Sequence, residues 1–225
     1  MARRRPRWYF SFRSPYSWIA YRDLLERYPD VAEQIDWLPF WEPDATATEE
    51  LAERDITLPY VTMSREKHLY ILQDVRRLTR QRGLDMVWPQ DKDPVWEVSH
   101  LAYLVAERLG SGRAFIDAVY RARWEQGKNI SEPEVMAGIG RDLGIDPEAL
   151  AGAHTDPDVR AEGARYLELL HRDGVFGVPY FIDGFEKFWG VDRLEDFVDL
   201  NRARRGETVP SPALALDQGH AGGCG

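Results

Sequence analysis

The chain has very little cysteine and no long apolar segment. Its 225 residues include one cysteine, Cys224, so an intrachain disulfide and a metal site made of several cysteines are both excluded. No run approaches the ~18 apolar residues that a membrane span needs, and basic residues lead directly into a strand pattern without an apolar leader. We therefore expect a cytoplasmic protein without a membrane partner.

Basic residues are also in the minority. The 29 Lys and Arg against 38 Asp and Glu give a net charge of −9, which argues against nucleic acid as a partner because phosphate binding needs clustered positive charge. Four histidines lack metal-ligand spacing, so we expect no metal and interpret them as surface or capping residues. They are His68, His100, His154 and His171. The length fits one domain with a sizeable core or one domain with a large insertion.

A strand followed at once by a helix opens the patterned part of the chain. The aromatic run from Trp8 to Phe12 predicts a buried strand. Ser14 and Pro15 then predict the start of a helix, with Ser14 as the N-cap and Pro15 as the first helical residue. The first backbone N–H groups of such a helix, and the positive end of its dipole, lie beside the serine hydroxyl. This arrangement stabilises an anion such as a thiolate.

The rest of the chain predicts further short strands separated by a long helical segment. Residues 44–165 show helical periodicity interrupted by Gly and Pro, which predicts about five helices. Beyond residue 206 the periodicity stops, which predicts a flexible tail over 206–225. The other expected elements are a helix ending near Tyr28, a strand over 35–40, a helix over 157–172, a strand over 179–182, a turn at Asp183-Gly184, a strand over 187–189 and a helix over 191–203.

Four segments, in order along the chain, are similar to one known family. They are FRSPYSW (residues 12–18), KHLYILQDVRRLTRQRGL (67–84), AVYRARWEQGKNIS (118–131) and FGVPYFIDGFEKFWGVDRL (176–194). In these segments the chain resembles the 2-hydroxychromene-2-carboxylate isomerase and kappa-class glutathione transferase family, relatives of the DsbA-like disulfide oxidoreductases. The resemblance implies an α/β thioredoxin-like fold (βαβ … αββα) over residues 7–43 and 166–205, interrupted by an all-helical insertion domain over residues 44–165.

The resemblance also implies a thiol site at the start of the first helix. The oxidoreductase relatives place two cysteines where this chain has Ser14 and Ser17, so dithiol redox chemistry is excluded here. In the family, the serine before Pro-Tyr donates a hydrogen bond to the sulfur of glutathione, which makes Ser14 the expected catalytic residue. The residues expected around the bound thiol are Pro15, Tyr16, Lys67, Val178, Pro179, Gly190, Val191, Asp192 and Arg193.

Several of these residues have roles that the resemblance implies. Pro179 is expected to be cis and to turn the preceding backbone toward the thiol, Asp192 to accept the γ-glutamyl ammonium, and Lys67 to meet the carboxylate of the glycine end. The chain departs from the family at Val191, which lacks a hydrogen-bonding side chain, and over residues 41–67, where glutathione-using members tend to carry an asparagine. The thiol is therefore left open between glutathione, another low-molecular-weight thiol and none.

The predicted function is that of a thiol-dependent isomerase acting on a conjugated aromatic or polyketide-like substrate. The aromatic residues expected to line the substrate pocket are Phe40, Tyr70, Trp88 and Trp96. Three alternatives stay open: a kappa-class-like glutathione transferase, a non-catalytic thioredoxin-fold binding module, and a thiol-free tailoring enzyme. Members of the family are commonly dimers, so the resemblance also implies a homodimer.

Overall fold

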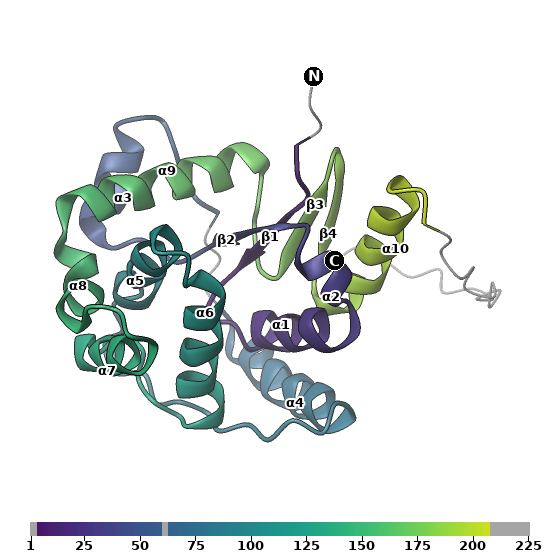
Figure 1. Cartoon of the computed structure of the whole chain (residues 1–225), viewed down its shortest axis with the longest axis horizontal. Coiled ribbons are helices and arrows are strands. Elements are labelled where there is room, and N and C mark those ends of the chain that lie inside the picture. Colours follow the sequence, from purple (N-terminus) through teal and green to yellow (C-terminus); the bar gives the residue numbers. More distant parts are fainter. Residues whose placement is uncertain (1–3, 60–62, 208–225) are drawn as a thin grey trace.

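The sheet is assembled from two segments that lie far apart in the sequence (Figure 1). The computed structural model describes residues 4–59 and 63–207, so Cys224 and the predicted tail from residue 208 on lie outside the described residues. The order of the strands in the sheet is β2-β1-β3-β4. β1 and β2 run parallel, and β3 runs antiparallel to β1 and β4, which confirms the predicted βαβ start and the later hairpin. The strands are β1 (Arg7–Phe10), β2 (Asp36–Pro39), β3 (Tyr180–Asp183) and β4 (Glu186–Trp189).

Successive side chains of β1 enter two cores on opposite faces of the sheet, as the alternation of a strand requires. Trp8 and Phe10 belong to the larger core, which also contains side chains of helix α1 (Pro15–Arg27). Tyr9 belongs to a smaller core together with a side chain of helix α9 (Pro157–Asp173). Figure 1 shows α9 above the sheet and α1 below it. The sheet is therefore covered on both faces.

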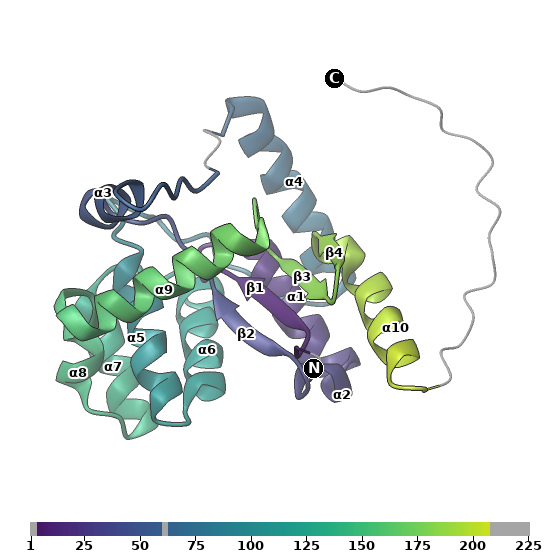
Figure 2. The same cartoon turned by 90° about the horizontal axis from the view of Figure 1, so that it is seen from above.

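Helices fill the chain between β2 and β3. Six α-helices, α3 to α8, lie in the described part of this segment before α9, where about five were predicted. Figure 2 shows α5 to α8 gathered on one side of the sheet, while α4 extends away from it. α9 continues without a break through residues 165 and 166, where the insertion is predicted to end. Among the helices of the described ranges, none is both long and apolar enough to cross a membrane.

The bounds of the remaining helices are α2 (Pro29–Ala32), α3 (Ala45–Ala52), α4 (Arg65–Gln81), α5 (Glu97–Arg108), α6 (Gly112–Tyr120), the π-helix η1 (Arg121–Glu125), α7 (Pro133–Leu143), α8 (Pro147–Gly152), the 3-10 helices η2 (Ala153–Thr155) and η3 (Val191–Arg193), and α10 (Leu194–Arg204).

Local sequence sets the start of several helices. Ser14, Asp44, Ser64 and Asp156 are N-caps whose side-chain oxygens accept hydrogen bonds from backbone N–H groups two or three residues further on. Such a cap satisfies a donor that the helix itself cannot pair and contributes about 1 kcal/mol. The predicted N-cap role of Ser14 is confirmed.

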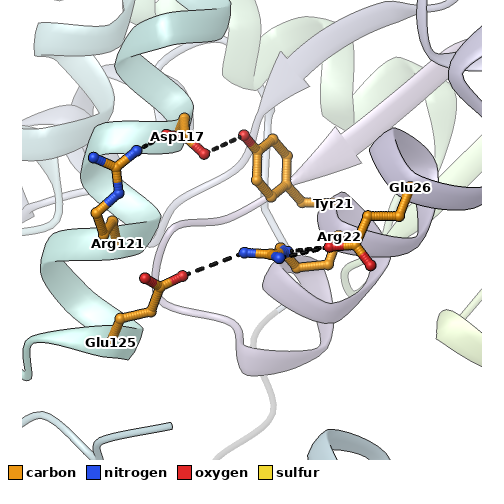
Figure 3. A network of polar contacts seen from close by, with 6 residues as sticks. All are labelled: Tyr21, Arg22, Glu26, Asp117, Arg121 and Glu125. Atoms are coloured by element: carbon orange, nitrogen blue, oxygen red, sulfur yellow. Dashed lines mark hydrogen bonds and ion pairs between the residues drawn. The ribbon is translucent and has the colours of Figure 1, made fainter. Parts of the chain in front are cut away.

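A polar network fastens α1 to the helical segment (Figure 3). The Tyr21 hydroxyl of α1 donates to Asp117 of α6 at 2.8 Å. Beside it, Arg22 of α1 forms an ion pair of 3.4 Å with Glu125 of η1. Because Ser14 is the N-cap of α1, these contacts hold the helix that follows the predicted catalytic residue.

Candidate functional site

Four backbone segments meet at one end of the sheet. The loop over residues 11–14 follows β1, and Phe40 follows β2, so the parallel pairing of these strands brings both to the same end. Residues 178–179 lie there too, because antiparallel β3 begins beside the end of β1. Gly190 follows β4, which returns to this end, and its N–H donates to the carbonyl of residue 179 at 3.0 Å. This sheet end therefore unites segments from both parts of the chain.

Ser14 offers an unused hydrogen at the start of α1. Its Oγ accepts a hydrogen bond from the Ser17 N–H at 3.2 Å, and its own N–H donates to the Ser11 carbonyl at 3.1 Å. No described residue accepts the hydrogen of the Ser14 hydroxyl or of the Tyr16 N–H. Two free donors thus lie at the positive end of the α1 dipole, where they favour an anion. Ser14 itself is partly exposed, so a ligand has access to it.

The peptide bond between Val178 and Pro179 is cis, the isomer that the family resemblance implies. Within the described ranges, neither the N–H nor the C=O of Val178 makes a hydrogen bond, although Val178 is half-buried. An unpaired backbone donor and acceptor at this depth are an open pairing edge for an extended ligand. Pro179 itself is buried.

The turn from Gly190 to Arg193 packs against α1 through η3. Gly190 has a φ of 103°, and a Cβ there would lie 2.4 Å from an Asp192 carboxylate oxygen, so the turn needs glycine. Val191 is buried in the larger core. The Asp192 side chain is 73% exposed, with the Arg193 guanidinium 3.9 Å away, while Arg193 also pairs with Asp196 at 3.3 Å. Asp192 is therefore an accessible carboxylate beside the sheet end.

Tyr16 uses its hydroxyl to join α1 to α4. It donates to Asp74 at 2.9 Å, and burial, followed by this hydrogen bond, raises the pKa of Tyr16. The Tyr16 side chain is therefore a protonated link between helices, and its backbone N–H is the group left for a ligand. Lys67 is exposed in the first turn of α4, about 10 Å along the helix axis from Asp74 by the helical rise. Its role in holding a carboxylate stays a prediction.

The four aromatic residues predicted for the substrate pocket lie in different surroundings. Phe40 lines an apolar pocket of about 390 Å³, and Trp96 lines a polar one of about 400 Å³. Tyr70 and Trp88 are 57% and 42% exposed, and the Trp88 ring packs edge-on against Trp124. Their assignment to the substrate stays a prediction. The apolar pocket is lined mainly by Phe40, Trp41, Pro43, Leu51, Ala52, Ile56 and Leu58.

The polar pocket is lined by charged residues that sequence reasoning did not single out, among them Arg13, Glu42 and Glu97. Arg13, which precedes Ser14, pairs with Glu42 and lies 5.4 Å from the Trp96 ring. Arg123 of η1 lies 5.1 Å from the same ring, and its side chain is 3% exposed. The buried Glu97 also faces this pocket, and burial raises its pKa. The contacts of these arginines with Glu42 and Trp96 join residues of different elements. Local sequence patterns do not indicate contacts of this kind.

His100 is a further residue that sequence reasoning missed. The prediction that it is a surface or capping histidine is wrong, because its side chain is completely buried. It lies in an almost wholly buried stretch of α5, where burial lowers its pKa to about 3. His68 and His171 are exposed, and His154 contacts the carbonyl of residue 151 near the end of α8, as predicted. Over residues 4–59 and 63–207, no group of His, Cys, Asp and Glu is arranged to hold a metal ion.

Comparisons with known proteins agree with this architecture. A family model of the DSBA-like thioredoxin domain matches residues 7–200, and the chain belongs to this family. A 2-hydroxychromene-2-carboxylate isomerase of Sphingobium xenophagum is 26% identical over 195 residues, which are 85% of this chain and 94% of the relative. A protein of the same name from Pseudomonas putida is 25% identical over 193 residues, or 83% of this chain and 88% of the relative.

A solved structure of 2-hydroxychromene-2-carboxylate isomerase matches with a TM-score of 0.69 at 21% identity. The match covers 89% of this chain and 98% of that chain. The predicted α/β thioredoxin-like fold and the resemblance to this isomerase family are thereby confirmed, and these relatives bear the names of isomerases.

Proposed function

We propose that the protein is a thiol-dependent isomerase of the 2-hydroxychromene-2-carboxylate isomerase kind. The observation that carries the proposal is the pair of free donors at the start of α1, the Ser14 hydroxyl and the Tyr16 N–H. They lie at the same sheet end as the unpaired backbone of Val178. The family relatives with isomerase names support the reaction class.

The residues present fit a peptide-like thiol such as glutathione. Ser14 donates its free hydrogen to the sulfur, and the Tyr16 N–H and the α1 dipole favour the thiolate over the thiol. The N–H and C=O of Val178 pair with the backbone of the cysteine portion. Asp192, exposed at the neighbouring turn, receives the ammonium of the γ-glutamyl end. When bound, the thiol supplies a nucleophilic sulfur that adds reversibly to a conjugated substrate, so that a bond can rotate.

The substrate of the proposed reaction is an aromatic or polyketide-like molecule with a conjugated bond. The apolar pocket beside Phe40 lies at the sheet end that carries Ser14 and has a size suited to one planar ring system. We also propose a cytoplasmic location, because a chain with one cysteine has no intrachain disulfide that an oxidising compartment would maintain. A homodimer is proposed from the family resemblance.

Turnover of 2-hydroxychromene-2-carboxylate, with and without glutathione, tests this function. We expect activity that requires the thiol, and Ser14→Ala should lower turnover about a hundredfold because it removes a donor to the reacting anion. Asp146→Ala is the control, because Asp146 caps α8 through one comparable contact, 3.0 Å from the Glu148 N–H, and has no part in the proposed thiol site. Both variants lose a cap worth about 1 kcal/mol, but only the first should lose activity.

Three other results would contradict the proposal. Ser14→Ala with unchanged turnover would remove the proposed role of the hydroxyl. Activity in thiol-free buffer would indicate a tailoring enzyme that does not use a thiol. A product that retains the thiol would indicate a glutathione transferase, in which the same residues hold the sulfur but the bond to it persists.

A further inference from the structure

The loop that carries Ser14 is held by side chains of the helical segment. The Phe12 N–H donates to Nε2 of His100, on α5, at 3.2 Å. The Phe12 carbonyl accepts a hydrogen bond of 3.2 Å from the indole N–H of Trp124, on η1. Phe12 precedes Ser14 by two residues. Its N–H and its C=O are thus both paired with side chains, from residues that lie 88 and 112 positions further along the chain.

Ser11 extends the contact between the loop and His100. Its hydroxyl lies 3.3 Å from Nε2 of His100 and accepts a hydrogen bond of 3.3 Å from the Arg13 N–H. The Ser11 carbonyl accepts from the Ser14 N–H at 3.1 Å. Since the Ser11 hydroxyl accepts from Arg13, its own hydrogen is available for Nε2. His100 thus receives two hydrogen bonds from the loop that leads to Ser14.

The hydrogen bonds around His100 define its tautomer. Nδ1 lies 2.7 Å from the Trp96 carbonyl, which can only accept, so Nδ1 carries the hydrogen. Nε2 is then a bare acceptor, as the Phe12 N–H requires. Complete burial keeps the ring neutral, and the rings of Phe12 and Trp41 pack against it at 4.9 and 5.7 Å. The imidazole is therefore a fixed acceptor in a closed environment.

We propose that His100 is a positioning residue. It holds the loop over residues 11–14 so that the Ser14 hydroxyl points toward the thiol bound at the start of α1. This inference rests on the proposed function, since it assigns His100 a role through Ser14. His100 itself does not touch the thiol or the substrate in this scheme. Its contribution is geometric, and a small displacement of a reacting group costs a large factor in rate.

Two substitutions of His100 separate its hydrogen bond from its bulk. His100→Gln places a side-chain amide oxygen near the position of Nε2 and keeps an acceptor for the Phe12 N–H. His100→Phe keeps an aromatic ring but leaves that N–H without a partner. We expect His100→Phe to lower kcat about ten- to a hundredfold, with His100→Gln recovering most of the loss. His154→Gln, at a histidine near the end of α8, is the control and should leave kcat unchanged.

A double-mutant cycle shows whether His100 acts through Ser14. In the Ser14→Ala background, His100→Phe should have no further effect on kcat, because the group that it positions is gone. If Ser14→Ala lowers kcat but the folded His100→Phe single variant does not, the positioning role is refuted while the proposed function stands. Equal, additive losses in both backgrounds also refute it. If Ser14→Ala itself has no effect, the proposed function fails and the inference fails with it.

A measurement on the unaltered protein covers the case in which His100→Phe does not fold. Nitrogen-15 NMR of labelled histidine should show His100 with a protonated Nδ1 and a bare Nε2. Hydrogen exchange of the Phe12 amide should be slow. A protonated Nε2, or rapid exchange of that amide, would overturn the inference because Nε2 would not be holding the loop.

Discussion

The ion-pair cluster at Asp30 sets a pH dependence that can be worked out from the structure. Arg202 binds the Asp30 carboxylate in a bidentate manner, with contacts of 2.7 and 3.0 Å. Arg205 adds a third contact of 2.8 Å. The hydrogen bond from Arg202, the largest cause, helps to lower the pKa of Asp30 from 3.8 to about 2. Because the folded-state pKa lies below the unfolded value, the cluster stabilises the fold above about pH 4 and loses this effect as the pH falls toward 2.

The size of the effect follows from the shift and the exposure of the carboxylate. A depression of this size corresponds to at most about 2.5 kcal/mol. The Asp30 side chain is 39% exposed, so solvent screening reduces the expected contribution to about 1 kcal/mol. Asp30→Asn should therefore lower the free energy of unfolding by about 1 kcal/mol at pH 7 and by only about a third of that near pH 2.5.

Urea unfolding of both proteins between pH 2.5 and 7 measures this difference. The control is Glu134→Gln, which removes an ion pair to Arg141 in which the glutamate side chain is 82% exposed. We expect a change of no more than a few tenths of a kcal/mol there. A destabilisation by Asp30→Asn that stays constant across the pH range would refute the reasoning, since it would not come from the titration of Asp30.

Two further predictions concern buried pairs. Tyr9→Phe removes the 2.5 Å hydrogen bond from a buried hydroxyl to Asp173 and should lower the free energy of unfolding by about 1–3 kcal/mol in urea; an unchanged midpoint would contradict it. Arg123→Lys replaces a fork that binds both oxygens of Asp91 at 2.8 Å beneath the Trp96 ring. A lysine cannot reproduce this bidentate geometry, so thermal unfolding should show a loss of about 1–3 kcal/mol in the free energy of unfolding. Equal stability of the two proteins would show that the bidentate ion pair is not needed.

Local signals predicted the parts of the fold that depend on neighbouring residues. Ser14 followed by Pro15 indicates a helix start, and the structure has Ser14 as the N-cap of α1. Gly184 indicates a hairpin turn, and β3 and β4 pair across it. The aromatic run at Trp8 indicates a buried strand, and the structure buries its side chains in two cores. In each case the stabilising contact lies within a few residues or follows from strand periodicity.

Long-range contacts explain what the sequence did not predict. His100 lies in an apolar helix without a motif, and its partner Phe12 is 88 residues away. Arg13 lies beside Ser14, but its pairing with Glu42 depends on the parallel pairing of β1 and β2, which brings the residues that follow both strands to one end of the sheet. Aromatic residues are too common in this chain, at 12%, for composition to show which of them border a pocket. Tertiary packing alone distinguishes the buried Trp96 from the exposed Tyr70.

The most direct test of the proposed thiol site is the pKa of glutathione bound to the protein. Ultraviolet absorbance of the thiolate during a pH titration reports this value for the unaltered protein, Ser14→Ala and the Asp146→Ala control. We predict a pKa lowered from about 8.5 toward neutrality in the unaltered protein and the control, and a return toward the free value in Ser14→Ala. The same bound pKa in all three proteins, or no binding of glutathione, would contradict the claim that Ser14 and the start of α1 stabilise a thiolate.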